Sequence, residues 1–372
     1  MTDSLPANHK ALVQEVYAKP LVVKSIPTPR PTPGSAVIEI LHAPIISYTR
    51  DVYNGKRKYP YPTPLVTGAS AIGRVAATGP DATLLKEGDL VYFDCTIRGR
   101  DDSSAIILAG IAESGTEGSR ILFHGEWRDG TFAEYAKVPL ENVFVLDEKR
   151  LCGKPADGGL GYQLEQMSWL LQVLVPYGGL KSIGLQAGET VIVAPATGGF
   201  GSAAVVIALA MGARVIAMGR SAEKLADLKA LSSRVETVQM TGELGSDVAA
   251  LKKFGKINAF LDISPAEAEG STHFKAAILS LAPEGRVSLM GGLLNDVAIP
   301  HRFVMRFDIT LRGKWMYSRA DILSLIDMMT AGVLNFRDIV NIRGTYNLED
   351  WEKALELAAN SGKLGELVVF SP

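Results

Sequence analysis

Hydrophobic and polar positions alternate over short distances in the N-terminal part of the chain. Over residues 1–150, brief β-branched runs such as 37–40 are separated by stretches rich in proline and glycine. Short apolar runs bounded by Pro and Gly turns are typical of an irregular β domain. We therefore predict strands at 37–40, within 66–75 and within 87–93.

The hydrophobic pattern changes in the middle of the chain. Longer apolar runs there predict strands at 189–194, 214–218, 259–263 and 286–290, and helical spacing predicts helices at 161–177, at 199–211 and from Ser221 onward. Strands that are apolar throughout and alternate with helices indicate a parallel sheet covered on both faces. The segment from residue 311 onward mixes the two patterns and is expected to pack back on the first domain.

Length and charge narrow the function classes. A chain of 372 residues suits two domains. Its 38 basic and 40 acidic residues are balanced, so we expect no nucleic-acid partner. We find no apolar run of the roughly 18 residues that a membrane helix needs, and no signal-peptide core. Two cysteines exclude a disulfide framework or a thiolate-rich metal cluster. We expect a cytoplasmic protein without a membrane partner.

A glycine cluster lies between the strand at 189–194 and the following helix. The candidate cofactor-binding residues in this turn are Thr197, Gly198, Gly199, Phe200 and Gly201. Gly198 lets the backbone approach a pyrophosphate, and Gly199 and Gly201 permit a tight turn and close packing of helix on strand. The helix N-terminus offers free N–H groups to the phosphates. Ala196 replaces the first glycine of the usual pattern. The alternative is an ordinary turn without a ligand, which three glycines in four positions disfavour.

The end of the next strand chooses between the two nicotinamide dinucleotides. An acidic residue at this point would bind the ribose hydroxyls of NAD, but the chain has Gly219, followed by Arg220, Ser221 and Lys224. A guanidinium, a hydroxyl and an ammonium suit a 2′-phosphate, and the missing acid removes a repulsion. We therefore predict NADPH/NADP+ as the cofactor. The alternative is a solvated helix start with no ligand.

These parts, in this order, resemble the medium-chain dehydrogenase/reductase superfamily, which includes zinc alcohol dehydrogenases and quinone reductases. Segments 84–91, 129–135 and 177–193 carry the resemblance together with the glycine turn. It implies an α/β protein with a GroES-like, β-rich catalytic domain at 1–172 and 311–372. A Rossmann domain with a doubly wound parallel sheet would occupy 173–310. Nicotinamide and substrate would bind in the cleft between the two domains. The resemblance also implies a homo-oligomer, a dimer by analogy.

The chain departs from the zinc-binding members of that family. Where they carry a cysteine, this chain has Ser47, and where they carry Gly-His-Glu it has Gly68-Ala69-Ser70. No cysteine occurs near 175–177, where a later ligand would fall. Zinc needs thiolate, imidazole or carboxylate ligands. We therefore predict no metal, and a place in the zinc-free branch that resembles quinone oxidoreductases and enoyl reductases.

Without a Lewis acid, the charge that develops on the hydride acceptor needs a hydrogen-bond or proton donor. The candidate catalytic residues are Ser47, Tyr48 and Tyr59. Ser47 and Tyr48 fall where zinc ligands and substrate meet in the relatives. Tyr59 falls near a proton-donating tyrosine of the family's enoyl reductases, at a slightly different spacing. Two alternatives stay open: protonation by bound water, and tyrosines that only pack with their hydroxyls hydrogen-bonded.

The last candidates follow the strand at 286–290. Gly291 and Gly292 would let the nicotinamide lie against the backbone, and Arg319 would reach the cofactor. We predict an NADPH-dependent, zinc-independent oxidoreductase that reduces an activated double bond of a hydrophobic small molecule. Enone C=C is slightly favoured over C=O or C=N+. The alternatives are a zinc-free, NADP-dependent alcohol dehydrogenase and a non-catalytic NADPH-binding protein.

Overall fold

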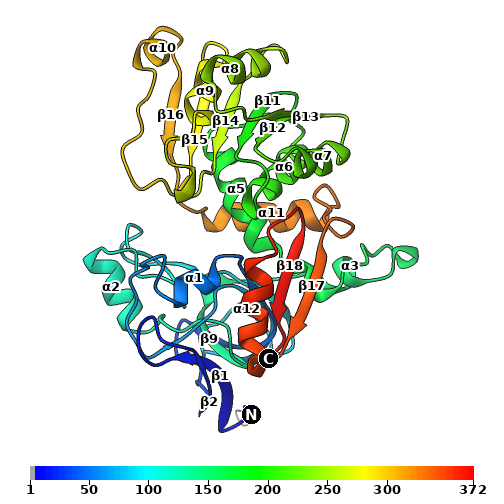
Figure 1. The fold of residues 1–372 in the computed structure, drawn as a ribbon. Coiled ribbons are helices and arrows are strands. Elements are labelled where there is room, and N and C mark those ends of the chain that lie inside the picture. The colour runs from blue at the N-terminus through cyan, green and yellow to red at the C-terminus, as the bar shows by residue number, and fades with distance from the viewer. Residues whose placement is uncertain (1–4) are drawn as a thin grey trace. The chain divides into compact units, whose positions relative to one another are not determined.

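The computed structural model describes residues 5–372, which divide into two compact units (Figure 1). The first unit comprises the described part of Met1–Leu171 with Val340–Ser361 and Glu366–Pro372. The second comprises Gln172–Ile339 and Gly362–Gly365. No helix among residues 5–372 is long and apolar enough to cross a membrane.

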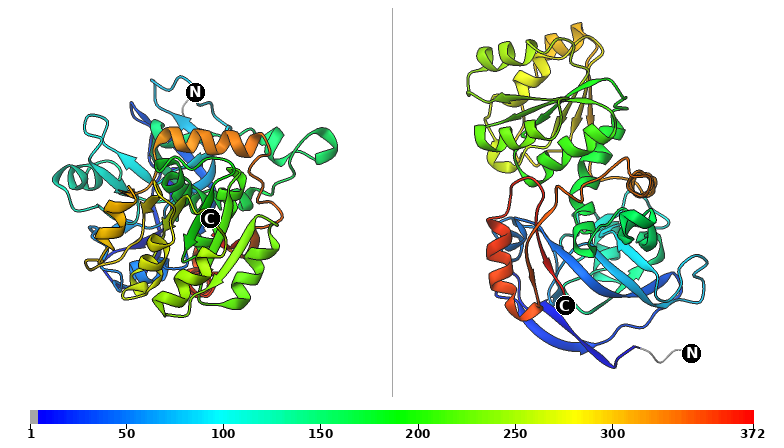
Figure 2. Two further views of the ribbon diagram at one scale, coloured as in Figure 1. Left: turned by 90° about the horizontal axis from the view of Figure 1, so that it is seen from above. Right: turned by 90° about the vertical axis from the view of Figure 1, so that its right-hand side faces the viewer.

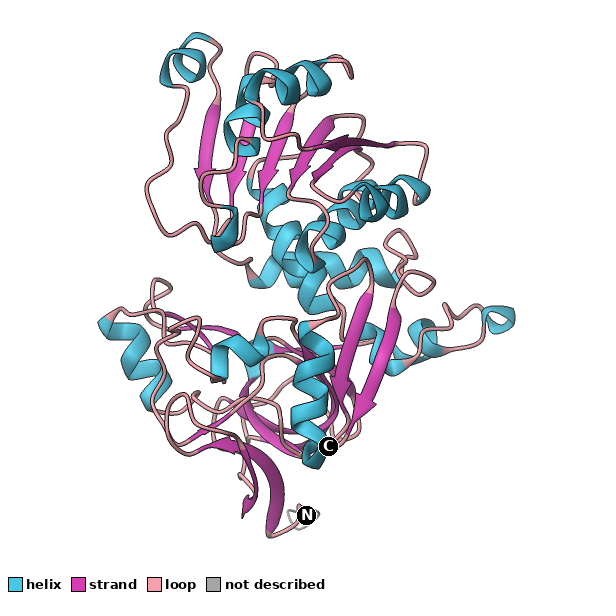
Figure 3. Cartoon of the chain, in the orientation of Figure 1, coloured by secondary structure: helices cyan, strands magenta, loops and turns pink. Residues whose placement is uncertain are grey.

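The first unit is rich in β structure, as Figure 3 shows. A seven-stranded sheet has the order β10-β6-β5-β3-β18-β17, and β9 also pairs with β3. Smaller sheets have the order β2-β1-β4 and the pair β7-β8. The C-terminal strand β18 runs antiparallel to β3, with Val368 opposite Ile45 and Phe370 opposite Ala43. The C-terminal segment therefore completes this unit.

The elements of the first unit are as follows. Its strands are β1 (Asn8–Gln14), β2 (Val22–Pro27), β3 (Ser35–Ile45), β4 (Leu65–Val66), β5 (Ala71–Thr78), β6 (Leu90–Phe93), β7 (Thr96–Arg98), β8 (Ile106–Leu108), β9 (Tyr135–Pro139), β10 (Val143–Val145), β17 (Asn341–Tyr346) and β18 (Glu366–Phe370). Its helices are α1 (Thr49–Tyr53), α2 (Glu117–His124), α3 (Glu148–Cys152), α4 (Leu164–Met167) and α12 (Trp351–Ala359), with 3₁₀ turns η1 (Leu140–Asn142), η2 (Pro155–Asp157) and η4 (Leu348–Asp350).

The second unit is built on a six-stranded parallel sheet of order β13-β12-β11-β14-β15-β16. Its strands are β11 (Thr190–Ala194), β12 (Arg214–Gly219), β13 (Val235–Gln239), β14 (Ala259–Asp262), β15 (Arg286–Leu289) and β16 (Thr310–Gly313). Its helices are α6 (Gly199–Ala210), α7 (Ala222–Ala230), α8 (Leu244–Lys252), α9 (His273–Leu279), α10 (His301–Arg306) and α11 (Arg319–Thr330), with η3 (Ala266–Ala268); the division between the units falls within α5 (Leu170–Ser182).

Helices cover both faces of this sheet: α6 and α7 pack on one, α8 and α9 on the other (Figure 2). Fully buried residues such as Ile192, Phe260 and Ile278 form the core beneath them. The strand order reverses between β11 and β14, and ligands bind at such a switch point in open α/β sheets. The predicted Rossmann-type sheet and the β-rich first domain are confirmed as the fold class.

The boundary near the C-terminus needs a correction. The sequence placed the return to the first domain at residue 311, whereas the second unit extends to Ile339. Strand β16 adds to the sheet beside β15, and α11 packs against the helix α5. Tyr177 Oη and Ser324 Oγ are 2.8 Å apart, and Lys181 Nζ lies 3.4 Å from a carboxylate oxygen of Asp321. These contacts hold 311–339 in the second unit.

Candidate active site

The glycine turn has the geometry that a bound pyrophosphate requires. Gly198 is the N-cap of α6 and has an extended backbone, with φ −92° and ψ 172°. A Cβ atom built on it would meet no atom within 4 Å, so the space beside its backbone is open. A Cβ on Gly201 would collide with the backbone oxygen of Pro195 and lie 2.9 Å from the carbonyl carbon of Ala196. Only glycine at 201 lets α6 start this close to β11.

The end of β12 carries two cations without a carboxylate partner. Among the described residues, neither the Arg220 guanidinium nor the Lys224 ammonium makes an ion pair or hydrogen bond. The Ser221 side chain is the N-cap of α7 and accepts a hydrogen bond from the Lys224 N–H at 3.3 Å. The nearby acid, Glu223, is itself paired with Lys363 at 3.0 Å. The local charge is therefore positive.

Backbone hydrogen bonds bring the glycine turn and the end of β12 together. The Ala196 N–H donates to the Met218 carbonyl at 2.8 Å, and the Met240 N–H donates to the Gly219 carbonyl at 2.9 Å. Thr197 consequently lies directly beside Gly219. The structure thus gathers two sets of predicted cofactor residues, Thr197–Gly201 and Gly219–Lys224, at one edge of the sheet.

The loops after β14 and β15 also meet at this edge. The Gly292 N–H donates to the Ser264 carbonyl at 2.7 Å. A Cβ on Gly291 would lie 2.6 Å from Oδ2 of Asp262, so Gly291 is required by close packing. A Cβ on Gly292 would meet nothing within 4 Å, which leaves its backbone approachable. Arg319 is the exposed first residue of α11, and its role in cofactor binding stays a prediction.

A network of buried polar side chains lies beneath these loops, and no sequence motif predicts it. Asp262, Ser264 and His273 are each 3% exposed or less. Ser264 Oγ lies 2.5 Å from Oδ1 of Asp262 and 2.8 Å from Nε2 of His273, whose Nδ1 lies 2.8 Å from Ser271 Oγ. Burial lowers the pKa of His273 to about 4 and raises that of Asp262. The imidazole is therefore neutral, and hydrogen bonds rather than an ion pair hold the β14 loop against Gly291.

The candidate proton donors lie in the first unit, around the start of α1. Tyr48 precedes α1, and the Arg57 guanidinium carbon lies 4.1 Å from the centre of its ring, a cation–π contact. Burial raises the pKa of Tyr48, and its neighbour Tyr59 raises it further, while the Arg57 charge lowers it. Ser47 precedes Tyr48 and is partly exposed. The structure thus brings Tyr48 and Tyr59 together.

Two other tyrosines of the same region have structural roles. The Tyr53 hydroxyl donates to the Gly110 carbonyl at 2.8 Å and accepts the Gly68 N–H at 2.8 Å. The buried Tyr61 hydroxyl donates to Oε1 of Gln14 at 2.8 Å. These two hydroxyls hold the fold together, and Tyr48 and Tyr59 stay the candidate donors.

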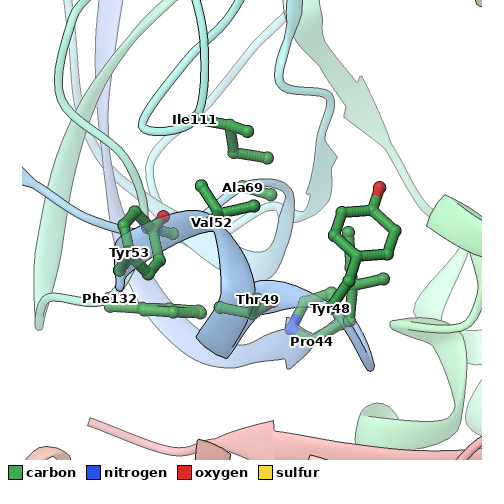
Figure 4. Close-up of a pocket in the computed structure, with 10 residues that line it drawn as sticks. Pro44, Tyr48, Thr49, Val52, Tyr53, Ala69, Ile111 and Phe132 are labelled. Carbon is green, nitrogen blue, oxygen red and sulfur yellow. The ribbon is translucent and has the colours of Figure 1, made fainter. Parts of the chain in front are cut away.

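A small cavity of about 10 Å³ lies beside these residues, with room for about one water molecule. Figure 4 shows Tyr48 and Tyr53 on opposite sides of Val52. The methyl group of Ala69 and the ring of Phe132 also line the cavity. Its wall is mostly apolar.

Known protein families match both units of the chain. A family model for the alcohol dehydrogenase GroES-like domain matches residues 32–148, and one for the zinc-binding dehydrogenase domain matches 199–331. Together they span about two thirds of the chain, one model in each unit.

The chain belongs to the medium-chain dehydrogenase/reductase superfamily. It is similar to acryloyl-coenzyme A reductase of Metallosphaera sedula, with 26% identity over 97% of this chain and 99% of that protein. It is also similar to alcohol dehydrogenase 1 of Emericella nidulans, at 26% identity over 99% of each. A solved cobalt- and zinc-bound alcohol dehydrogenase from Pyrobaculum aerophilum has the same fold, with a TM-score of 0.74, 22% identity and coverage of 98% and 100%.

Membership of this superfamily makes the chain an oxidoreductase that uses a nicotinamide cofactor. The open glycine turn fits such a cofactor, because Gly198 leaves its backbone approachable and Gly201 lets the helix start close by. The family therefore argues against the alternative of a non-catalytic NADPH-binding protein.

The zinc implied by one matching family does not fit the residues present. Ser47, Ala69 and Ser70 supply no thiolate, imidazole or carboxylate, and the Ser70 hydroxyl accepts the Cys95 N–H at 3.2 Å. Burial raises the pKa of the Cys95 thiol to about 12, which disfavours the thiolate that binds zinc. Within residues 5–372, we find no group of three His, Cys, Asp or Glu side chains that could hold a metal ion.

Proposed function

We propose that this oxidoreductase uses NADPH and, without zinc, reduces an activated double bond of a hydrophobic small molecule. The observation that carries the cofactor choice is the end of β12. Gly219 there offers no carboxylate to the ribose, and the Arg220 and Lys224 side chains have no ion-pair partner within residues 5–372. A guanidinium binds a phosphate in a forked geometry, and a second cation adds to the attraction.

The nicotinamide supplies the hydride, and the chain's own residues then have two tasks. The glycine turn and the Gly291–Gly292 loop hold the cofactor through backbone groups. The Tyr48 or Tyr59 hydroxyl donates a hydrogen bond or proton to the atom on which negative charge develops. The Tyr48 hydroxyl is protonated at neutral pH, and burial, which raises its pKa further, favours hydrogen-bond donation over full proton transfer. Ser47 is a further hydrogen-bond donor in this segment.

The proposed independence from zinc rests on ligand chemistry. Ser47, Ala69 and Ser70 stand where the zinc-binding members have their ligands, and none provides a donor that zinc prefers. A hydroxyl donor takes the place of the Lewis acid in this proposal.

The acceptor is an activated C=C bond in the favoured version. The similarity to an acryloyl-coenzyme A reductase supports a conjugated carbonyl substrate, in which hydride adds to one alkene carbon and a proton to the other. The similarity to alcohol dehydrogenase 1 supports the second candidate, a zinc-free alcohol dehydrogenase. We also propose that the protein is a cytoplasmic homo-oligomer. Strand β16 lies at the edge of its sheet with mostly exposed residues, and such a strand can pair with the same strand of a second copy.

Product analysis separates the two candidates. The enzyme is incubated with NADPH and a conjugated enone, a conjugated thioester, a quinone, a saturated aldehyde and a cyclic imine. We expect saturated carbonyl products from the enone or thioester. An allylic alcohol from the enone, with fast reduction of the saturated aldehyde, would support the dehydrogenase instead.

A further inference from the structure

One contact at the end of β12 is closer than any side chain would permit. A Cβ atom built on Gly219 would lie 2.6 Å from Cγ2 of Thr197 and 3.1 Å from its Oγ1. The Cβ of Thr197 itself would be 3.4 Å away, which is ordinary van der Waals contact. The two branch atoms of Thr197 therefore occupy the space into which a side chain at 219 would extend.

The backbone cannot open to relieve this contact. The Ala196–Met218 hydrogen bond holds the glycine turn against β12, and the Met240–Gly219 hydrogen bond holds Gly219 against β13. Gly219 is buried between them. Moving residue 219 away from Thr197 would break one of these hydrogen bonds.

Rotation of the Thr197 side chain gives only partial relief. Threonine has two heavy atoms on Cβ and few favourable χ1 angles. Any staggered rotation leaves at least one of the two branch atoms on the side of Gly219. An alanine at 197 would remove both atoms and keep only the Cβ at its ordinary distance.

We propose that Thr197 is a specificity-determining residue for the cofactor. It excludes every side chain from position 219, including the carboxylate that would bind the ribose hydroxyls of NADH. This inference rests on the proposed use of NADPH. Cofactor choice is then set by two effects: Arg220 and Lys224 attract the phosphate, while Thr197 keeps the competing acid out of position 219.

The contact between Thr197 and Gly219 predicts which substitutions would change the preference from NADPH to NADH. Gly219→Asp alone should lose NADPH without gaining useful NADH affinity, since the new carboxylate has no room. Thr197→Ala/Gly219→Asp should gain NADH affinity by about 10- to 100-fold over Gly219→Asp, the range for a charged hydrogen bond to a hydroxyl. Thr197→Val/Gly219→Asp is the matched control, because valine still carries two branch atoms on Cβ and only replaces the hydroxyl by a methyl group.

The experiment measures dissociation constants for NADPH and NADH for these variants by fluorescence titration. It also measures the melting temperature of ligand-free Gly219→Ala and Thr197→Ala/Gly219→Ala proteins. Overpacking by one methyl should lower the melting temperature by roughly 2–10 °C in the single variant, and Thr197→Ala should restore most of it.

The outcomes are distinct. Rescue of NADH affinity by alanine but not by valine at 197, together with recovery of the Gly219→Ala melting temperature by Thr197→Ala, supports the inference. Tight NADH binding by Gly219→Asp alone, with an unchanged melting temperature for Gly219→Ala, would overturn it. A wild-type protein that binds NADH as tightly as NADPH would instead refute the proposed cofactor, while the melting temperatures would still decide whether Thr197 closes position 219.

Discussion

Removal of the Arg220 guanidinium is the sharpest perturbation of the proposed phosphate site. Arg220→Ala deletes a cation that has no partner among residues 5–372 and leaves Ser221 and Lys224 in place. Because no ion pair is broken in the free protein, the loss should appear in cofactor binding and hardly in stability.

The size of the expected loss in NADPH affinity follows from the charge and the solvent exposure of Arg220. A hydrogen bond between charged groups contributes about 1.5–3 kcal/mol. Arg220 is exposed, so solvent and salt screen part of this and the lower end applies. We expect the affinity for NADPH to fall roughly tenfold, corresponding to about 1.4 kcal/mol. NADH lacks the phosphate, and its affinity should change less than about twofold by the same reasoning.

The assay is a titration of both cofactors at low and high ionic strength. Arg214→Ala is the matched control, since Arg214 is exposed at the opposite end of the same strand and changes the net charge equally. The NADPH affinity of the wild type should fall with salt more steeply than that of Arg220→Ala. Equal weakening of NADPH and NADH in Arg220→Ala would refute the assignment of this residue to the 2′-phosphate.

Three further predictions address the rest of the site. Gly201→Ala should lower the melting temperature and weaken the binding of both cofactors alike, because its Cβ would collide with the Pro195–Ala196 backbone after β11; unchanged binding would contradict the close packing. His273→Asn should flatten the pH dependence of unfolding: the folded-state pKa of about 4 lies below the unfolded value of 6.5, so wild type loses stability, up to about 3 kcal/mol, as pH falls through that window. The raised pKa of Asp262 has the opposite effect on stability in both proteins, so it does not distinguish them. If the free energy of unfolding, measured by urea denaturation from pH 7 to 4, falls equally in both proteins, His273 is not the cause of the loss. Tyr48→Phe or Tyr59→Phe should lower kcat by about 10²- to 10⁴-fold with little change in NADPH affinity, measured by steady-state kinetics; full activity in both would assign the proton to water.

The sheet of the second unit was predictable because its strands are apolar on both faces. Residues such as Ile192 and Phe260 are fully buried, and so the runs that contain them stand out in the sequence. The α11 segment was misplaced for a different reason. Its buried face, Ile322, Leu325, Ile326 and Met329, has helical spacing, but that spacing does not say which domain the helix packs against. The contacts of Tyr177 with Ser324 and of Lys181 with Asp321 join residues far apart in the chain, and only the fold shows them.

The candidate site was predictable to a similar extent. Glycines between a strand and a helix indicate a phosphate turn, because few other reasons require them there. The packing of Thr197 on Gly219 was not predictable, since it depends on the distance between two loops. Nor could the sequence separate Tyr53, whose hydroxyl bridges two backbone groups, from Tyr48. Asp262 and His273 gave no motif, and only the fold brings them together through Ser264.

The most direct test of the central claim is NADPH consumption by metal-analysed, chelator-treated protein with a conjugated carbonyl acceptor. We predict turnover that survives EDTA, less than stoichiometric zinc, and a kcat/KM for NADPH well above that for NADH. Activity that disappears on chelation and returns with added zinc, or an equal or greater kcat/KM with NADH, would contradict the account.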